Sequence, residues 1–161
     1  MKIFRFVAGL LVVATVSGNA LANENFLNHT FTLRGKIGGD PTSFKIYIDP
    51  KGRVFFFANN QGCASTGVEG KLNGSMQSSY TCPATGGKLH VSNTMTTRLS
   101  GEHISLNMTT HARSNTAKFN TKYDFSWNSS GKDCGSVLYK VRGDGFSYVF
   151  KDFSCSVKNG R

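Results

Sequence analysis

The chain has 161 residues and carries 19 lysines and arginines against nine aspartates and glutamates, a formal net charge of +10. This length predicts one domain, large enough to bury a hydrophobic core. The positive surplus is compatible with anionic partners such as nucleic acid, phospholipid headgroups, acidic polysaccharide or an acidic protein, but a role in solubility alone is the simpler interpretation. The basic residues are spread along the chain, which excludes a basic tail of the kind that binds nucleic acid.

The N-terminal segment has the three parts of a secretory signal peptide. Lys2 and Arg5 give it a positive start, residues 6–16 form an apolar run, and small residues lead to Ala20-Leu21-Ala22. A helix that spans a bilayer needs about 20 apolar residues, and this run is about half as long. We therefore expect residues 1–22 to be a signal peptide. Residues 23–161 should form a single all-β domain without a transmembrane segment, periplasmic or secreted.

Apolar and polar residues alternate along most of the mature chain, and glycine, asparagine, aspartate and serine separate the runs. This pattern predicts many short antiparallel strands. The clearest strand spans residues 119–127, where Phe119, Tyr123, Phe125 and Trp127 share one face. We expect a single-domain antiparallel meander of roughly nine to eleven short strands, folded as a β-barrel or a β-sandwich, with a barrel or a strongly bent sheet favoured.

Four turn sequences predict hairpins and set their registers: Asp49-Pro50-Lys51-Gly52, Asn73-Gly74, Gly101-Glu102 and Asp144-Gly145. Asn73-Gly74 should join a strand near residues 64–72 to one near residues 75–82. Around Asp144-Gly145, the apolar residues of both strands fall on one face, which specifies the register strongly. These residues are Val137, Tyr139, Val141, Phe146, Tyr148 and Phe150.

Four cysteines, Cys63, Cys82, Cys134 and Cys155, predict two disulfides, because an even number of cysteines in an exported chain favours complete pairing. The register around Asp144-Gly145 places Cys134 directly opposite Cys155. The register around Asn73-Gly74 places Cys63 diagonally across from Cys82. We therefore predict the pairs Cys63–Cys82 and Cys134–Cys155. No cysteine or histidine spacing favours a metal site, and no metal or cofactor is expected.

One hairpin supplies the candidate binding residues. Phe55 and Phe57 should point away from the core on the same face as Tyr47, with Lys45 and Arg53 nearby. This aromatic face is either a second buried layer or an exposed patch that contacts a ligand or partner.

The sequence contains no recognisable catalytic motif. Glu102-His103 is the only adjacent acid–histidine pair, and it could act as an acid and a base in phosphodiester cleavage. Polar residues in a predicted turn more often face water, so this pair is a weak candidate. The leading interpretation is an exported, non-enzymatic binding protein with a rigid, disulfide-linked β scaffold, for an anionic ligand, an envelope component or a protein partner. The alternatives are a small basic secreted hydrolase, such as a nuclease, and a structural component of the envelope.

The signal peptide leads to a direct prediction. The mature protein should begin at Asn23, immediately after Ala20-Leu21-Ala22. N-terminal sequencing of the protein purified from the cell envelope or the medium measures this. An intact Met1 on that material would contradict both export and the argument for disulfides.

Overall fold

The computed structural model describes residues 25–58, 68–84 and 87–161. Within these ranges the chain contains ten β-strands and no helix, which confirms the all-β prediction. The strands are β1 (His29–Ile37), β2 (Asp40–Ile48), β3 (Arg53–Ala58), β4 (Val68–Lys71), β5 (Gly74–Ala84), β6 (Gly87–Ser100), β7 (His103–Arg113), β8 (Lys118–Asn128), β9 (Val137–Gly143) and β10 (Phe146–Asn159).

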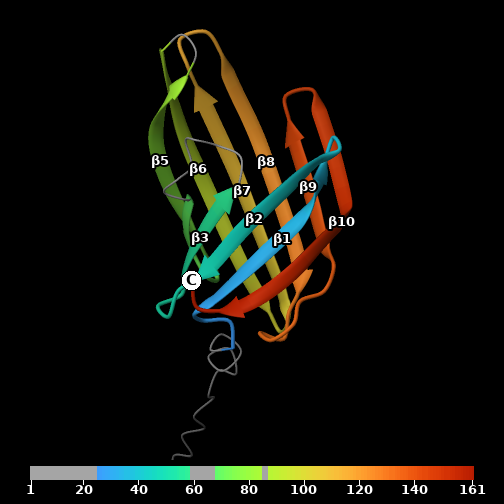
Figure 1. Ribbon diagram of the computed structural model, residues 1–161. Helices are drawn as coiled ribbons and strands as arrows, with labels where there is room; N and C mark the ends of the chain where they lie inside the picture. The colour runs from blue at the N-terminus through green and yellow to red at the C-terminus, as the bar shows by residue number, and fades with distance from the viewer. Residues whose placement is uncertain (1–24, 59–67, 85–86) are drawn as a thin grey trace, which may run out of the picture.

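The ten strands form one antiparallel sheet in the order β4-β3-β2-β1-β10-β9-β8-β7-β6-β5. Strands that follow one another in the chain are paired with a single exception, β4 and β5, which form the two edges of the sheet. In addition, the first strand, β1, pairs with the last, β10. The sheet is strongly bent, so β1, β2 and the second half of β10 cross in front of the long strands β6–β8 (Figure 1). The result is a nearly closed, barrel-like sheet. The sequence left a β-barrel and a β-sandwich open, and the structure has the barrel-like form.

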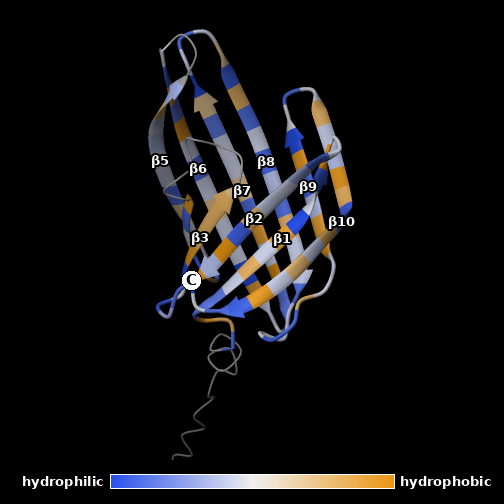
Figure 2. Cartoon of the chain, viewed as in Figure 1, coloured by the Kyte–Doolittle hydropathy of each residue, from blue (hydrophilic) through white to orange (hydrophobic). Residues whose placement is uncertain are grey.

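The core lies between the two crossing halves of the sheet. Apolar residues alternate with polar ones along the strands (Figure 2), and the apolar ones meet inside. Aromatic rings connect the halves: the centroids of Phe31 and Trp127 are 5.5 Å apart, and those of Phe44 and Phe125 are 5.0 Å apart. Burial of one such side chain contributes about 1.5–3 kcal/mol. The largest fully buried side chains are Trp127, Tyr139, Phe31, Phe125, Leu33, Ile46, Ile48, Met95, Ile104, Leu106, Val54 and Val137.

Strand β10 joins the two halves because it pairs with a different strand along each half of its length. Its first half pairs with β9, where Phe150 faces Tyr139, and its second half pairs with β1, where Val157 faces Phe31. The register with β9 shifts between Phe150 and Phe153. Such a β-bulge bends a strand and increases its twist. Gly35 on β1 permits the crossing, because a Cβ at this position would lie 2.5 Å from the Phe153 ring.

Three of the four predicted hairpins are confirmed. The turn at residues 49–52 pairs Ile46 with Phe56, and Gly101-Glu102 pairs Thr97 with Leu106. Asp144-Gly145 pairs Tyr139 with Phe150 as predicted, but beyond the bulge the register is shifted by one residue.

The inner face of the β9–β10 hairpin is only partly buried. Val141 is buried, whereas its partner Tyr148 is 58% exposed and Phe146 is 40% exposed. The reason is that β1 pairs only with residues 154–159 of β10, so the start of the strand extends beyond the core. The alternating pattern therefore predicted the face correctly and its burial only in part.

The hairpin predicted at Asn73-Gly74 is wrong. The chain does turn here, with a φ of 54° at Asn73, but β4 pairs with β3, and β5 pairs with β6 from Gly74 onward. The side-chain Oδ1 of Asn73 accepts a hydrogen bond from the backbone N–H of Leu99 on β6, at 2.7 Å. Gly70 of β4 packs against the Met95 side chain of β6. These contacts bring β4 against β6, so the turn connects two edges.

The Cys134–Cys155 disulfide is confirmed, with the two Cα atoms 5.5 Å apart. Cys134 does not lie on a long strand as predicted; it forms an isolated bridge with Ser129 in the loop before β9. Cys155 lies on the half of β10 that pairs with β1, opposite Leu33. The disulfide therefore links the β8–β9 loop to the bent strand. Cys63 lies outside the described residues, and its pairing with Cys82 stays a prediction.

The confirmed disulfide is compatible with an exported protein. Among the strands and loops that the structure describes, there is no helix long and apolar enough to cross a membrane.

Replacement of both Cys134 and Cys155 by serine should destabilise the protein. A bridge that closes a loop of about this length contributes about 3 kcal/mol, which corresponds to a loss in melting temperature on the order of 10 °C. Thermal unfolding followed by circular dichroism measures the loss. Peptide mapping of the wild-type protein without reductant is the control: a peptide that joined Cys134 to Cys63 or Cys82 would contradict this connection.

Candidate functional site

A groove on the outer face of β1, β2, β3 and the end of β10 gathers basic and aromatic side chains. Its volume is about 510 Å³. We call it the basic groove; it is lined by Thr30, Thr32, Arg34, Ser43, Lys45, Tyr47, Phe57, Ala58, Lys158 and Arg161. Three of the five predicted binding residues, Lys45, Tyr47 and Phe57, line it.

Strand alternation positions these side chains. Residues of β1 and β2 that alternate with core residues must point outward, and the register sets them side by side. Lys45 on β2 lies between Thr32 on β1 and Phe57 on β3. On the other side of β1, Lys158 of β10 pairs with Thr30. Lys158 and Thr30 belong to the row that continues to Tyr47, and Lys45 belongs to the neighbouring row, so four strands contribute two adjacent rows of outward side chains.

The aromatic rings form a half-buried platform at one end of the groove. The Tyr47 and Phe55 rings are stacked, with centroids 6.0 Å apart. The guanidinium of Arg161 lies 5.4 Å from the Phe57 centroid, and that of Arg53 lies 5.4 Å from the Phe55 centroid. Cations at these distances are attracted to the ring face. Phe55 and Phe57 are therefore neither a second core layer nor a bare apolar patch; they support cations.

The groove is strongly positive. Arg34, Lys45, Lys158 and Arg161 line it, and among the described residues no aspartate or glutamate does. Main-chain contacts hold the last of these cations over the sheet. The Thr30 hydroxyl donates to the Gly160 carbonyl at 2.6 Å, and the Lys158 ammonium donates to the main-chain oxygen of Arg161 at 2.9 Å.

Asp49 supports the hairpin that carries the platform. Its buried carboxylate accepts hydrogen bonds from the backbone N–H groups of Lys51 and Arg53, both at 2.8 Å, and from the Arg53 guanidinium at 2.6 Å. Burial alone would raise the pKa of this carboxyl, but the hydrogen bonds from Arg53 and Lys51 outweigh burial and lower it. Asp49 thereby fixes the position of Arg53 beside Phe55. The turn sequence at residues 49–52 predicted the hairpin but not this role of Asp49.

Glu102 and His103 do not form a shared site in the structure. Glu102 lies exposed in the β6–β7 turn, and its carbonyl accepts a hydrogen bond from the Ser129 backbone. The His103 ring is 2.9 Å from the Asn128 side-chain oxygen and faces a different groove, which Lys151 lines and Glu102 does not.

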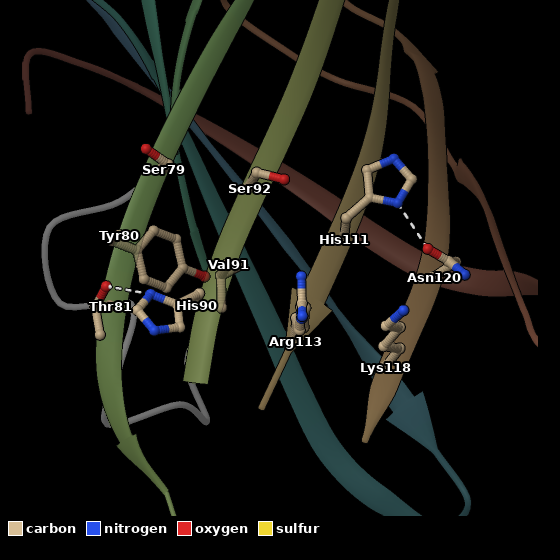
Figure 3. A pocket seen from close by; sticks show the side chains of 11 residues that line it. Ser79, Tyr80, Thr81, His90, Val91, Ser92, His111, Arg113, Lys118 and Asn120 are labelled. Carbon is tan, nitrogen blue, oxygen red and sulfur yellow. Dashed lines mark hydrogen bonds between the residues drawn. The ribbon is translucent and has the colours of Figure 1, made fainter. Parts of the chain in front are cut away.

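A second groove lies on the outer face of β5–β8, and Figure 3 shows the side chains that line it. It measures about 540 Å³ and includes Ser92, His90, His111, Arg113, Lys118 and Asn120. We call it the histidine groove. None of these residues was predicted as a site from the sequence, although extension of the register around Gly101-Glu102 along both strands leads to the pair His90 and Arg113.

A small cavity of about 80 Å³ lies between the aromatic core and Asn93. The side-chain oxygen of Asn93 accepts a hydrogen bond from Thr110 at 2.7 Å. Burial raises the pKa of the nearby Tyr139 hydroxyl far above its usual range, with a smaller contribution from Tyr123, so this group stays protonated in the core. In the described ranges, no group of three or more His, Cys, Asp or Glu side chains is arranged to hold a metal ion.

No protein-family model, curated protein or solved structure matches this chain. Function is therefore inferred from the two grooves themselves.

Replacement of Asp49 by asparagine should destabilise the fold at neutral pH, by about 1–3 kcal/mol, because the hydrogen bonds from Arg53 and Lys51 lose a charged acceptor. A carboxyl whose pKa is lowered on folding contributes stability above its ordinary pKa of 3.8, and this contribution is lost as the pH falls through the lowered value. The variant should therefore lose less stability than the wild type between pH 5 and pH 2. Urea unfolding across this range measures it; parallel curves for the two proteins would contradict the role of Asp49.

Proposed function

We propose that this protein is an exported, non-enzymatic binding protein that holds an anionic ligand, or an anionic segment of a partner, in the basic groove. The observation that carries the proposal is the lining of the groove. Four cations lie beside half-buried aromatic rings, and none of the described residues that line the groove has a carboxylate side chain. Cations gathered on one face repel one another and attract carboxylate, phosphate or sulfate groups.

The geometry of the groove supports recognition of more than charge. Tyr47 and Phe57 present ring surface within the groove, and Arg161 is held against Phe57 by its cation–π contact. A guanidinium in a fixed position loses little conformational entropy when it binds an oxyanion, and it can donate two parallel hydrogen bonds. The rings offer contact area to an apolar or flat part of the same ligand. A partner that combines anionic groups with sugar rings or other flat surfaces fits this groove.

The scaffold suits a binding role. The rows of outward side chains lie on paired strands of a sheet whose inner face forms the core, so these residues are held by rigid elements and not by a loop. The hydrolase alternative relied on Glu102 and His103, which face different surroundings. The alternative of a structural envelope component has no specific observation in its favour.

The contribution of the cations in the groove can be separated from that of the total charge by comparing two double variants. The double variant Arg34→Gln/Lys45→Gln should bind heparin, used as a model polyanion, more weakly than Lys140→Gln/Lys151→Gln, because both variants lose two positive charges but only the first loses them from the groove. Each lost contact should also reduce the slope of log K against log salt by up to about 0.9. Calorimetric titrations at several salt concentrations measure both quantities.

If the two double variants had equal affinity and equal salt slope, heparin binding would depend only on the net charge of the protein. This result would overturn the proposal. Phe57→Leu provides a further check, because it preserves the charge. It should weaken binding if the ring contributes contact area, and its thermal unfolding confirms that the variant is folded.

A further inference from the structure

The histidine groove has a different construction from the basic groove, and it lies on different strands. Its basic side chains follow the register: His90 on β6 lies opposite Arg113 on β7, which lies opposite Lys118 on β8. The second imidazole, His111, lies two residues from Arg113 on the same face of β7. Figure 3 shows these side chains on three neighbouring strands of the outer face. All four are exposed, so they are accessible to a ligand in solution.

A chain of hydrogen bonds determines which nitrogen of His111 carries a proton. The Asp144 carboxylate accepts hydrogen bonds from the backbone N–H of Asn120 at 3.2 Å and from its side-chain amide nitrogen at 3.3 Å. The amide of Asn120 therefore turns its NH₂ toward Asp144 and its oxygen toward His111. That oxygen is 2.7 Å from Nδ1 of His111 and can only accept. Nδ1 of His111 consequently donates, and the neutral ring leaves Nε2 as a bare acceptor.

This tautomer controls what the ring can bind. An oxyanion requires hydrogen-bond donors, and a bare Nε2 lone pair repels it. Protonation of His111 converts Nε2 into a charged donor without disturbing the hydrogen bond from Nδ1 to Asn120. His90 is not restricted in this way, because its Nδ1 lies 3.1 Å from the Thr81 hydroxyl, which can donate or accept. His111 is thus the position at which protonation changes the chemistry of the groove.

We propose that the histidine groove binds a tetrahedral oxyanion, of the phosphate or sulfate class, and that binding is coupled to protonation of His111. Arg113 and Lys118 supply permanent positive charge, while His90 and His111 supply donors. This site is independent of the basic groove.

The charged surroundings of His111 favour this coupling. The residues directly opposite it, Ser92 on β6 and Asn120 on β8, are uncharged. An anion bound beside the ring favours its protonated form. Protonation and anion binding therefore strengthen each other, as linkage requires. The titratable and charged groups that adjoin His111 on this face are His90, Arg113, Lys118, Lys122 and Asp144, the last bound to Asn120.

Sulfate is the appropriate probe, because it stays a dianion across the pH range in which histidine titrates. Sulfate titrations of the full chain, followed by the imidazole nitrogen signals in NMR spectra, should move the signals of His90 and His111 at pH 5.5. The dissociation constant should be about tenfold higher at pH 8, within the range typical of coupled sites. Arg34→Gln/Lys45→Gln should bind sulfate at these histidines as the wild type does, which separates this site from the basic groove.

Two exposed-residue variants test the assignment. His111→Gln should bind sulfate with a smaller dependence on pH than the wild type, because glutamine can donate but cannot titrate and only His90 remains as an imidazole in the groove. His103→Gln is the matched control: its ring contacts an asparagine oxygen in the same way but lies in another groove, and it should keep the wild-type pH dependence. Equal sulfate affinity of the wild type at pH 5.5 and pH 8, or unchanged pH dependence in His111→Gln, would overturn the proposal.

A second arm identifies the source of the oxyanion. Vesicles of phosphatidylglycerol in phosphatidylcholine replace sulfate, and the same histidine signals are followed at pH 5.5. A response to sulfate alone assigns a small oxyanion in solution, and a response to both assigns a phospholipid headgroup as well; either supports the site. Signals of His90 and His111 that move with neither probe, or no more than those of His103, would overturn it.

Discussion

The two-sided pairing of β10 is the constraint on which the rest of this structure depends. β10 pairs with β9 through residues 146–153 and with β1 through residues 154–159, and the bulge between Phe150 and Phe153 bends the strand ahead of the second segment. The bend turns β1–β4 across β6–β8, so that Phe31 meets Trp127 and Phe44 meets Phe125. The Cys134–Cys155 disulfide links the second half of the strand to the β8–β9 loop. The packing of the core, the position of the disulfide and the barrel shape therefore all depend on the bend in β10.

The same bend determines what the surface presents. Where β10 joins β1, its outward residues continue the rows of β1, β2 and β3, and Lys158 comes to lie beside Thr30 in the row that leads to Tyr47. The groove is thus assembled from segments more than 100 residues apart in the chain, on a face whose reverse side is packed in the core. The long strands β5–β8 carry the histidine groove on their own outer face. The two sites face solvent from different parts of one sheet, so each can be altered without removing the other.

Turn chemistry and alternation predicted the parts of this fold that depend on near neighbours in the chain. The turn at residues 49–52 and Gly101-Glu102 set their registers because apolar side chains had only one way to share a face. Asn73-Gly74 carried an equally strong local signal, yet pairing with β3 and β6 prevailed over a hairpin between β4 and β5. Local preference is a weak guide where both strands have longer partners elsewhere.

The candidate sites were predictable to a similar extent. Lys45, Tyr47 and Phe57 belong to one hairpin, so alternation sufficed to group them. Lys158 could not be added, because no turn connects β1 to β10. Arg34 lies opposite Ser43 in the β1–β2 hairpin, whose turn was not among the four predicted ones. The position of Asp49 beneath Arg53 follows from side-chain hydrogen bonds that a turn pattern does not encode. The tautomer of His111 depends on contacts among three residues from three different segments, which only the folded chain brings together.

The pairing of β10 can be measured directly by cross-strand nuclear Overhauser effects in the purified, oxidised protein. Backbone contacts should connect Phe150 to Tyr139 and, in the same strand, Val157 to Phe31. Observation of both sets would establish the joint between the two halves, and with it the adjacent rows of side chains that form the basic groove. If the second half of β10 showed no contact with β1, the sheet would not close here, and the account of both the core and the groove would be contradicted.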